Sequence, residues 1–331
     1  PRVGGATRDA AGIAIQVSRA VFPDAAGDAA AAAPKARHVV LARDDTWADS
    51  LAGTALSGDW GPILYARGGP AGTLPDETLA ELRRVLGPGG RVYLLGGAGA
   101  LSPAVEQAVA AAGFAPKRLS GEERLRTALA IAAEVRALHP ASGRVLVARA
   151  YDTPVDALAS GAAAGHHHVP LVLSPTPGLT HQFLRDGVAG LGVPDATLVG
   201  GTAALSEQVA ADLRALGLRA ERVSGPTRWH TAVAIADRFF PAPRTSVVAV
   251  DLESAPGWAW ALAAGALSAM LDAPQLGVAP SYAPTPTTDE IRSGGGTAAA
   301  PLRVVVVGDA ERVSTAVRVA LREAAEGAQA A

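Results

Sequence analysis

The chain has 331 residues, a formal net charge of −2 at pH 7 and hydrophobic side chains at 49% of its positions. The near-neutral charge argues against a generic nucleic-acid binder, and the lack of cysteine excludes disulfides and thiolate metal or redox sites. No segment approaches the roughly 18 uncharged apolar residues that would indicate a transmembrane helix.

Short apolar runs recur along the chain, and each predicts a strand of a parallel sheet. Unbroken runs of this length, without polar alternation, are typical of strands covered on both faces. Helical periodicity lies between them. Ile13, Val17 and Val21 recur at every fourth position, which predicts one buried helix face, and residues 76–86 read likewise. The predicted strands are 39–41, 63–65, 92–95, 145–148, 171–173, 197–199, 247–250, 275–278 and 304–307.

Two segments lack such periodicity. Residues 25–34 predict a surface loop. Residues 283–301 contain Gly294, Gly295 and Gly296 in succession, which argues against a helix there.

One pattern occurs three times. It begins with R-V-G-G-A-T-R, R-L-S-G-E-E-R and R-V-S-G-P-T-R at positions 2, 118 and 222, and later reaches a glycine signal at positions 96, 200 and 308. A period of roughly 100–120 residues is the size of a small domain. We therefore predict three tandem, similar α/β domains at residues 1–116, 117–220 and 221–331. Alternating strands and helices predict a small doubly wound, mostly parallel sheet in each, with a short first strand at R-x-x-G and helix swapping between neighbours left open.

A glycine pair closes the last apolar run of the first two copies, as Gly96-Gly97 and Gly200-Gly201. Such a turn between strand and helix exposes backbone N–H groups that hold anions, although a purely structural role is the alternative. In the third copy Asp309 replaces the second glycine, and we expect it to satisfy the turn internally. A serine follows each first glycine by six residues, as Ser102, Ser206 and Ser314, and Ser102 with Pro103 after it predicts a helix N-cap.

An arginine recurs six residues after the start of each copy, as Arg8, Arg124 and Arg228. A cation near a helix N-terminus is disfavoured by the helix dipole, so its recurrence needs a reason. A salt bridge to a neighbouring domain and the binding of an anion are the two alternatives. Arginine suits the second, because its planar fork grips phosphate and carboxylate groups in bidentate geometry.

An acid also recurs after the first apolar run of two copies, in T-W-A-D-S-L and T-P-V-D-A-L. These acids are Asp49 and Asp156, whereas the third copy has Trp260 at this position. A carboxylate here would form a structural salt bridge or contact sugar hydroxyls. Because the third copy differs at Trp260 and Asp309, we expect the first two repeats to carry most of the ligand binding.

Sequence signals for catalysis are weak. The chain contains no G-x-S-x-G elbow, no paired carboxylates shared by all copies and no G-x-G-x-x-G with a well-placed acid. His166, His167 and His168 are consecutive, so their side chains diverge rather than share one metal ion. We therefore expect no catalytic residue, cofactor or metal site.

Taken together, R-x-x-G-x-x-R followed by T-A in two copies, the D-A-L segment and V-G-G-x-x-A-L-S resemble the cell wall-binding repeat 2 family. This resemblance covers essentially the whole chain. It implies three α/β domains packed around a pseudo-threefold axis. It also implies a non-catalytic module that anchors a secreted or surface protein of a Gram-positive bacterium to an anionic cell-wall polymer or glycan.

Several further expectations follow. We expect a secreted, wall-associated monomer from which a signal peptide has been removed, with no nucleic-acid partner. The alternative is an enzyme that binds a nucleotide or phosphorylated sugar at the glycine turns.

Overall fold

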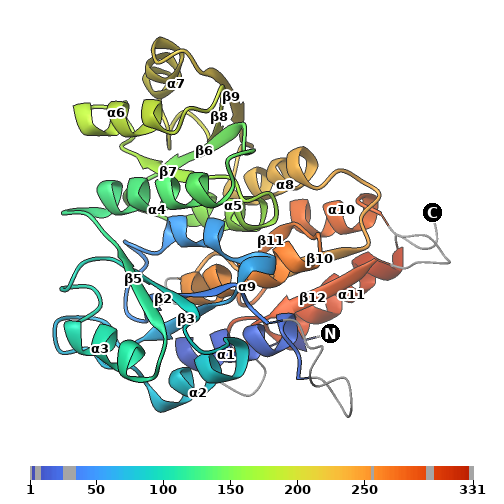
Figure 1. Ribbon diagram of the computed structural model, residues 1–331. Helices are drawn as coiled ribbons and strands as arrows, with labels where there is room; N and C mark the ends of the chain where they lie inside the picture. The colour runs from blue at the N-terminus through green and yellow to red at the C-terminus, as the bar shows by residue number, and fades with distance from the viewer. Residues whose placement is uncertain (1, 4–8, 25–34, 255–256, 296–301, 328–331) are drawn as a thin grey trace.

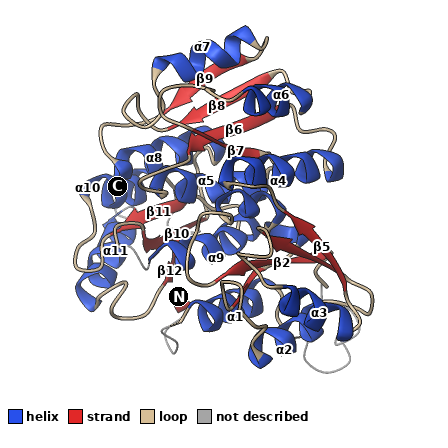
Figure 2. Ribbon diagram, turned by 90° about the vertical axis from the view of Figure 1, so that its left-hand side faces the viewer, coloured by secondary structure: helices blue, strands red, loops and turns tan. Residues whose placement is uncertain are grey.

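The computed structural model describes residues 2–3, 9–24, 35–254, 257–295 and 302–327. The loop predicted at 25–34 lies outside these residues. The described strands form three parallel sheets, each of four strands, which Figures 1 and 2 show around a group of central helices. In sheet order, the strands are β3 (Ile63–Ala66), β2 (His38–Arg43), β4 (Arg91–Leu95) and β5 (Ala115–Leu119); β7 (Leu171–Ser174), β6 (Arg144–Arg149), β8 (Asp195–Val199) and β9 (Arg219–Val223); and β11 (Gln275–Val278), β10 (Ser246–Asp251), β12 (Arg303–Val307) and β1 (Arg2–Val3). Every predicted apolar run lies in one of these strands, so the predicted α/β class of three similar domains is confirmed.

The strand that carries R-x-x-G adds to the sheet of the preceding repeat. Arg118 lies on β5, which pairs with β4, and Arg222 lies on β9, which pairs with β8. Arg2 lies on β1, which pairs with β12 and so joins the start of the chain to the third sheet. The predicted limits after residues 116 and 220 fall inside β5 and β9. These limits remain a proposal for where the sequence repeats begin and end. The sheets themselves are made from residues 38–119, 144–223, and 246–307 with 2–3.

The helix after each R-x-x-G strand stays with its own repeat. α1 (Ala10–Val21), α4 (Arg124–Leu138) and α8 (Arg228–Phe239) pack on β3, β7 and β11 respectively. They also contact the neighbouring repeats: α1 contacts α9 (Gly257–Met270), α4 contacts the 3-10 helix η2 (Leu51–Leu56), and α8 contacts α5 (Val155–His166). The predicted stripe of α1 is fully buried at Ile13, Val17 and Val21. The outer helices are α2 (Asp76–Val85), α3 (Pro103–Ala111), α6 (Gln182–Gly190), α7 (Glu207–Ala215), α10 (Thr285–Ser293) and α11 (Thr315–Gly327).

Helix α10 corrects the expectation that residues 283–301 contain no helix. Ile291 is completely buried, and the Thr287 hydroxyl donates to the carbonyl of Gly277 at 2.6 Å. These contacts outweigh a weak local pattern, because tertiary packing supplies most of the stability of a short helix. The helix ends at Gly294, and residues 296–301 lie outside the described part of the chain.

Close packing of small residues holds the three repeats together at the centre. There the 3-10 helices η2 (Leu51–Leu56) and η3 (Gly58–Trp60) meet α5 (Val155–His166) and α9 (Gly257–Met270). A Cβ on Gly161 would lie 3.0 Å from the Thr54 Cγ2 atom, and one on Gly165 would lie 2.9 Å from the Thr54 carbonyl oxygen. The absence of side chains at these two glycines therefore lets the first two repeats approach closely. None of the described helices is long and apolar enough to cross a bilayer.

Candidate functional site

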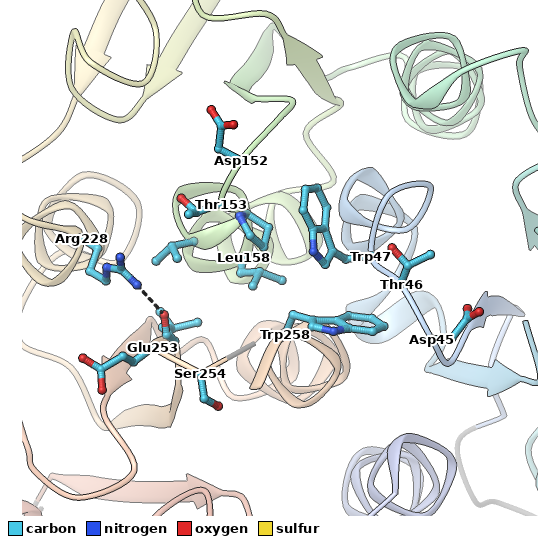
Figure 3. Close-up of a pocket in the computed structure, with 13 residues that line it drawn as sticks. Asp45, Thr46, Trp47, Asp152, Thr153, Leu158, Arg228, Glu253, Ser254 and Trp258 are labelled. Carbon is cyan, nitrogen blue, oxygen red and sulfur yellow. Dashed lines mark hydrogen bonds between the residues drawn. The ribbon is translucent and has the colours of Figure 1, made fainter. Parts of the chain in front are cut away.

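A cavity of about 300 Å³ opens on the pseudo-threefold axis, where the loops after β2, β6 and β10 meet (Figure 3). In the first two sheets the chain leaves the central strand toward one side, from β2 to β3 and from β6 to β7, and leaves the adjacent strand toward the other side, from β4 to β5 and from β8 to β9. Such switch points are the usual binding crevices of open parallel sheets. The lining residues come from all three repeats: Asp45, Thr46, Trp47, Asp152, Thr153, Pro154, Val155, Leu158, Arg228, Leu252, Glu253, Ser254 and Trp258.

Two tryptophans form the apolar wall of this axial cavity. Trp47 and Trp258 are half-buried, and in Figure 3 both indoles lie on one side of Leu158 while Arg228 lies on the other. Trp258 is held edge-on to the Tyr65 ring at 6.2 Å between centroids, and the Tyr65 hydroxyl donates to the carbonyl of Ala259 at 2.7 Å. The partly exposed indoles therefore have fixed positions from which to pack on a ligand.

Two of the predicted arginines lie at or beside this cavity: Arg228 lines it, and Arg124 lies over the ring of Trp47, which lines it. Arg124 and Arg228 are the first residues of α4 and α8, and each donates from Nη1 to the carbonyl one residue beyond a central strand. The acceptors are Ala150, at 3.0 Å, and Leu252, at 3.4 Å. Over the described part of the chain, neither guanidinium has a carboxylate within 4.0 Å, so the salt-bridge alternative is not found for these two. Arg8 lies outside the described residues.

Arg124 also connects the first two repeats. Its guanidinium lies 5.0 Å from the centroid of the Trp47 ring and 5.1 Å from that of Tyr151. A guanidinium over an aromatic face is attracted by the ring quadrupole and keeps its N–H edge free to donate. Because Trp47 lines the axial cavity, Arg124 extends the site toward the boundary between these repeats.

The structure brings the predicted acids and first glycines together in two equivalent pairs. A Cβ on Gly96 would lie 2.9 Å from the Asp49 Oδ2 atom, and one on Gly200 would lie 2.5 Å from the Asp156 Oδ2 atom. Both glycines have positive φ angles, 97° and 112°, so glycine is required for conformation and for space. Within the described residues neither acid forms an ion pair, and neither is among those that line the axial cavity. Burial raises the pKa of Asp156, while the nearby arginines Arg149 and Arg228 oppose the shift.

The second glycines, Gly97 and Gly201, begin a separate turn rather than a helix. The carbonyl of Gly97 accepts the N–H groups of residues 100 and 101, and Gly201 does the same for residues 204 and 205. Helix α3 starts only at Pro103, where the Ser102 Oγ atom accepts the N–H of Val105 at 3.3 Å. The N-terminus of α3 is therefore capped by its own serine and does not open onto the glycine turn.

The third repeat differs from the other two at this place. The Asp309 Oδ1 atom accepts the N–H groups of Glu311 and Arg312, each at 2.9 Å, which confirms that this acid satisfies its own turn. Trp260, at the position of the matched acids, is a core residue with 2% exposure. The Asp–Gly pair is thus replaced by apolar packing in the third repeat.

The charges around the axial cavity are mixed. Asp45, Asp152 and Glu253 line it together with one guanidinium, that of Arg228. Asp45 is paired with Arg43 at 2.5 Å, and Asp152 lies 3.6 Å from Arg149, which ends the equivalent strand. These acids were not predicted as site residues. They lie just after the central strands, and this shared position within the repeats could have identified them from the sequence.

The three consecutive histidines hold repeats together. His166 Nδ1 lies 2.9 Å from the carbonyl oxygen of Ala269, and His167 Nε2 lies 3.0 Å from that of Phe239. His168 Nε2 lies 2.8 Å from Asp59 Oδ1, and its ring stacks on Trp60 of the first repeat. Their rings thus contact separate elements, and no group of three potential metal-ligating side chains occurs among the described residues.

Three α/β repeats that together line one cavity define a modular protein with a crevice between its repeats. The sequence model for Cell wall binding domain 2 (CWB2) matches residues 2–106, 118–210 and 222–318. The chain belongs to this family and carries three tandem copies of its domain.

Two solved structures share the fold. Cwp6 from Clostridium difficile aligns with 97% of this chain at a TM-score of 0.80 and 23% identity, and Cwp8 from the same organism aligns with 99% at 0.81 and 22%. The chain spans only about half of each, 47% and 51% respectively. Among curated proteins, none matches the sequence significantly.

Proposed function

We propose that this chain is a non-catalytic module that anchors a secreted or surface protein to an anionic cell-wall polymer. The observation that carries the proposal is how the guanidiniums of Arg124 and Arg228 are held. Each donates to a backbone carbonyl, Arg228 in the lining of the axial cavity and Arg124 beside it, and neither has a carboxylate within 4.0 Å among the described residues. Family membership supports a cell-wall partner of some kind.

The mixed lining favours a polymer that carries both anionic groups and hydroxyls. Guanidinium N–H groups would donate to phosphate or carboxylate oxygens. Asp45, Asp152 and Glu253 would accept from sugar hydroxyls, and the faces of Trp47 and Trp258 would pack on sugar rings. A polymer of dense negative charge without hydroxyls would be repelled by the same three acids.

Because Arg228 and Trp258 line the cavity, we propose that all three repeats contribute to binding. This proposal departs from the sequence expectation that the first two repeats dominate. That expectation depended on Asp309 and Trp260, which are not among the residues that line the axial cavity.

The rival proposal, an enzyme with a nucleotide or phosphorylated sugar at the glycine turns, has less support. A phosphate site at a helix N-terminus needs free N–H groups there. Ser102 instead caps α3, and Asp309 occupies the turn of the third repeat.

The test compares retention on isolated cell walls of Gram-positive bacteria for Arg124→Gln and Arg228→Gln against wild type. We expect each variant to bind at least about tenfold more weakly, the scale of losing charge-assisted hydrogen bonds. Arg219→Gln is the matched control, because Arg219 is exposed at the edge of the second sheet and pairs with Asp195. Equal retention of all three variants, with unchanged melting temperatures, would contradict the proposed role of these arginines.

A further inference from the structure

The first arginine of the repeat motif is neutralised where its strand joins the first and the second sheet. Arg118 Nη1 donates to the carbonyl of Gly96 at 2.9 Å, and its Nη2 reaches Glu106 at 2.8 Å. On the second sheet, Arg222 reaches the carbonyl of Gly200 at 2.9 Å and the carboxylate of Glu207 at 3.1 Å. Each of these edge-strand arginines is thus paired with an acid from the helix beside it.

The third sheet keeps this arginine, as Arg2, but lacks the acid. Arg2 Nε donates to the carbonyl of Gly308 at 2.7 Å, as its counterparts do. The position of Glu106, four residues after the capping serine of α3, is occupied by Arg318 on α11. The position of Glu207 is occupied by Thr315, which accepts from Arg318 Nη2 at 2.9 Å. A second cation therefore stands where the first two repeats place a carboxylate.

Both of these arginines have buried donors without a partner. Across the described residues, neither the Nη2 atom of Arg2 nor the Nε atom of Arg318 has a hydrogen-bond acceptor, and both atoms are shielded from solvent. Buried donors are normally satisfied, and an orphan on a charged group is especially unfavourable. Two such donors in one place indicate an acceptor that comes from outside these residues.

The two arginines line one cavity, of about 530 Å³, on the open side of β12. Its walls are apolar, and its other charged residues are Arg303, Arg322 and Glu326. Glu326 lies 3.7 Å from Arg322, and both are exposed at the rim. The lining thus carries four guanidiniums and a single carboxylate, which is already engaged. An anion would be stabilised by this excess of positive charge.

We propose that this cavity is a second ligand site, which binds an organic oxyanion such as a phosphate monoester or a carboxylate. The oxyanion takes the place of Glu106 and accepts hydrogen bonds from the guanidiniums of Arg2 and Arg318. The apolar part of the ligand packs on Val304, Val306 and Leu321. This site is separate from the axial cavity and does not depend on the proposed function.

The test is calorimetric titration of the full chain with phenyl phosphate and with inorganic phosphate at constant ionic strength. Wild type should bind phenyl phosphate in a saturable way and more tightly than inorganic phosphate. Arg318→Glu places a carboxylate at the position that Glu106 occupies in the first repeat. The variant should therefore weaken phenyl phosphate binding by at least about tenfold. The same variant should melt at a higher temperature than wild type without ligand, because one orphan donor is removed and the Arg2 guanidinium gains a carboxylate partner.

Arg214→Glu is the matched control, since it makes the same charge change at an exposed position on α7. Arg318→Gln provides a second variant that removes the cation without adding an acid, and it should also weaken binding. The site assignment would be overturned by unchanged affinity in both folded Arg318 variants, or by an equal loss in Arg214→Glu. Equal affinity of wild type for the two probes would overturn the organic character of the ligand.

Discussion

Substitution of Gly200 by alanine should destabilise the protein, because the backbone conformation there disfavours a side chain and the new Cβ would collide with Asp156. The φ angle of 112° is rarely adopted by residues with a side chain, and such strain costs about 1–3 kcal/mol. The new Cβ would lie 2.5 Å from the Asp156 Oδ2 atom, and overpacking of this kind costs a further ~1–3 kcal/mol. The free energy of unfolding should therefore fall by about 2–6 kcal/mol, out of roughly 5–15 kcal/mol typical of folded domains.

Asp156→Ala should remove the steric part of this cost. In chemical denaturation, the double variant should be more stable than the sum of the single changes predicts, with a coupling of about 1–3 kcal/mol. Gly201→Ala is the neighbouring control, because its Cβ would meet no atom within 4 Å. It should change stability by no more than about 0.5 kcal/mol. A Gly200→Ala effect as small as that of Gly201→Ala, or strictly additive single changes, would refute the reasoning.

Two further predictions concern buried charges. Burial lowers the pKa of His38 to about 4 despite its hydrogen bond to the carbonyl of Leu56. Between pH 6.5 and 4 the imidazole is therefore protonated in the unfolded chain but neutral in the folded chain. Stability should fall by up to about 3 kcal/mol as the pH drops through this window, and His38→Gln should flatten the fall; an unchanged pH profile would show that other groups cause it. Glu290→Ala should cost about 1–3 kcal/mol in denaturation experiments, because it leaves a buried donor of Arg244 unsatisfied although Asp237 still pairs with that guanidinium at 2.8 Å, while Glu323→Ala, at an exposed position, should cost almost nothing. Similar losses in the two glutamate variants would contradict the importance of this ion pair.

Local sequence patterns were sufficient to predict the central strands and the buried face of α1. The runs at 39–41, 145–148 and 247–250 are apolar because both faces of these strands are covered, and that condition is visible in one short segment. Which sheet β5 joins is not a local property. Its sequence, A-P-K-R-L, is compatible with either neighbour, and only the three-dimensional packing places it beside β4.

The site was predictable to a similar extent. Matching positions in the repeats singled out Asp49, Asp156 and their glycines, and the structure brings each acid against its glycine. The axial cavity was missed because its lining is assembled from loops whose sequences differ between repeats. The difference between Glu106 in the first repeat and Arg318 in the third could be interpreted only after the structure showed that Glu106 pairs with Arg118.

The most direct test of the anchoring role uses purified sacculi before and after their secondary polymers are stripped. Wild-type chain should be retained on intact sacculi, should be released as salt rises because exposed ion contacts are screened over roughly 8–10 Å at physiological salt, and should not bind stripped sacculi. Undiminished binding to stripped sacculi at high salt would contradict attachment through an anionic polymer.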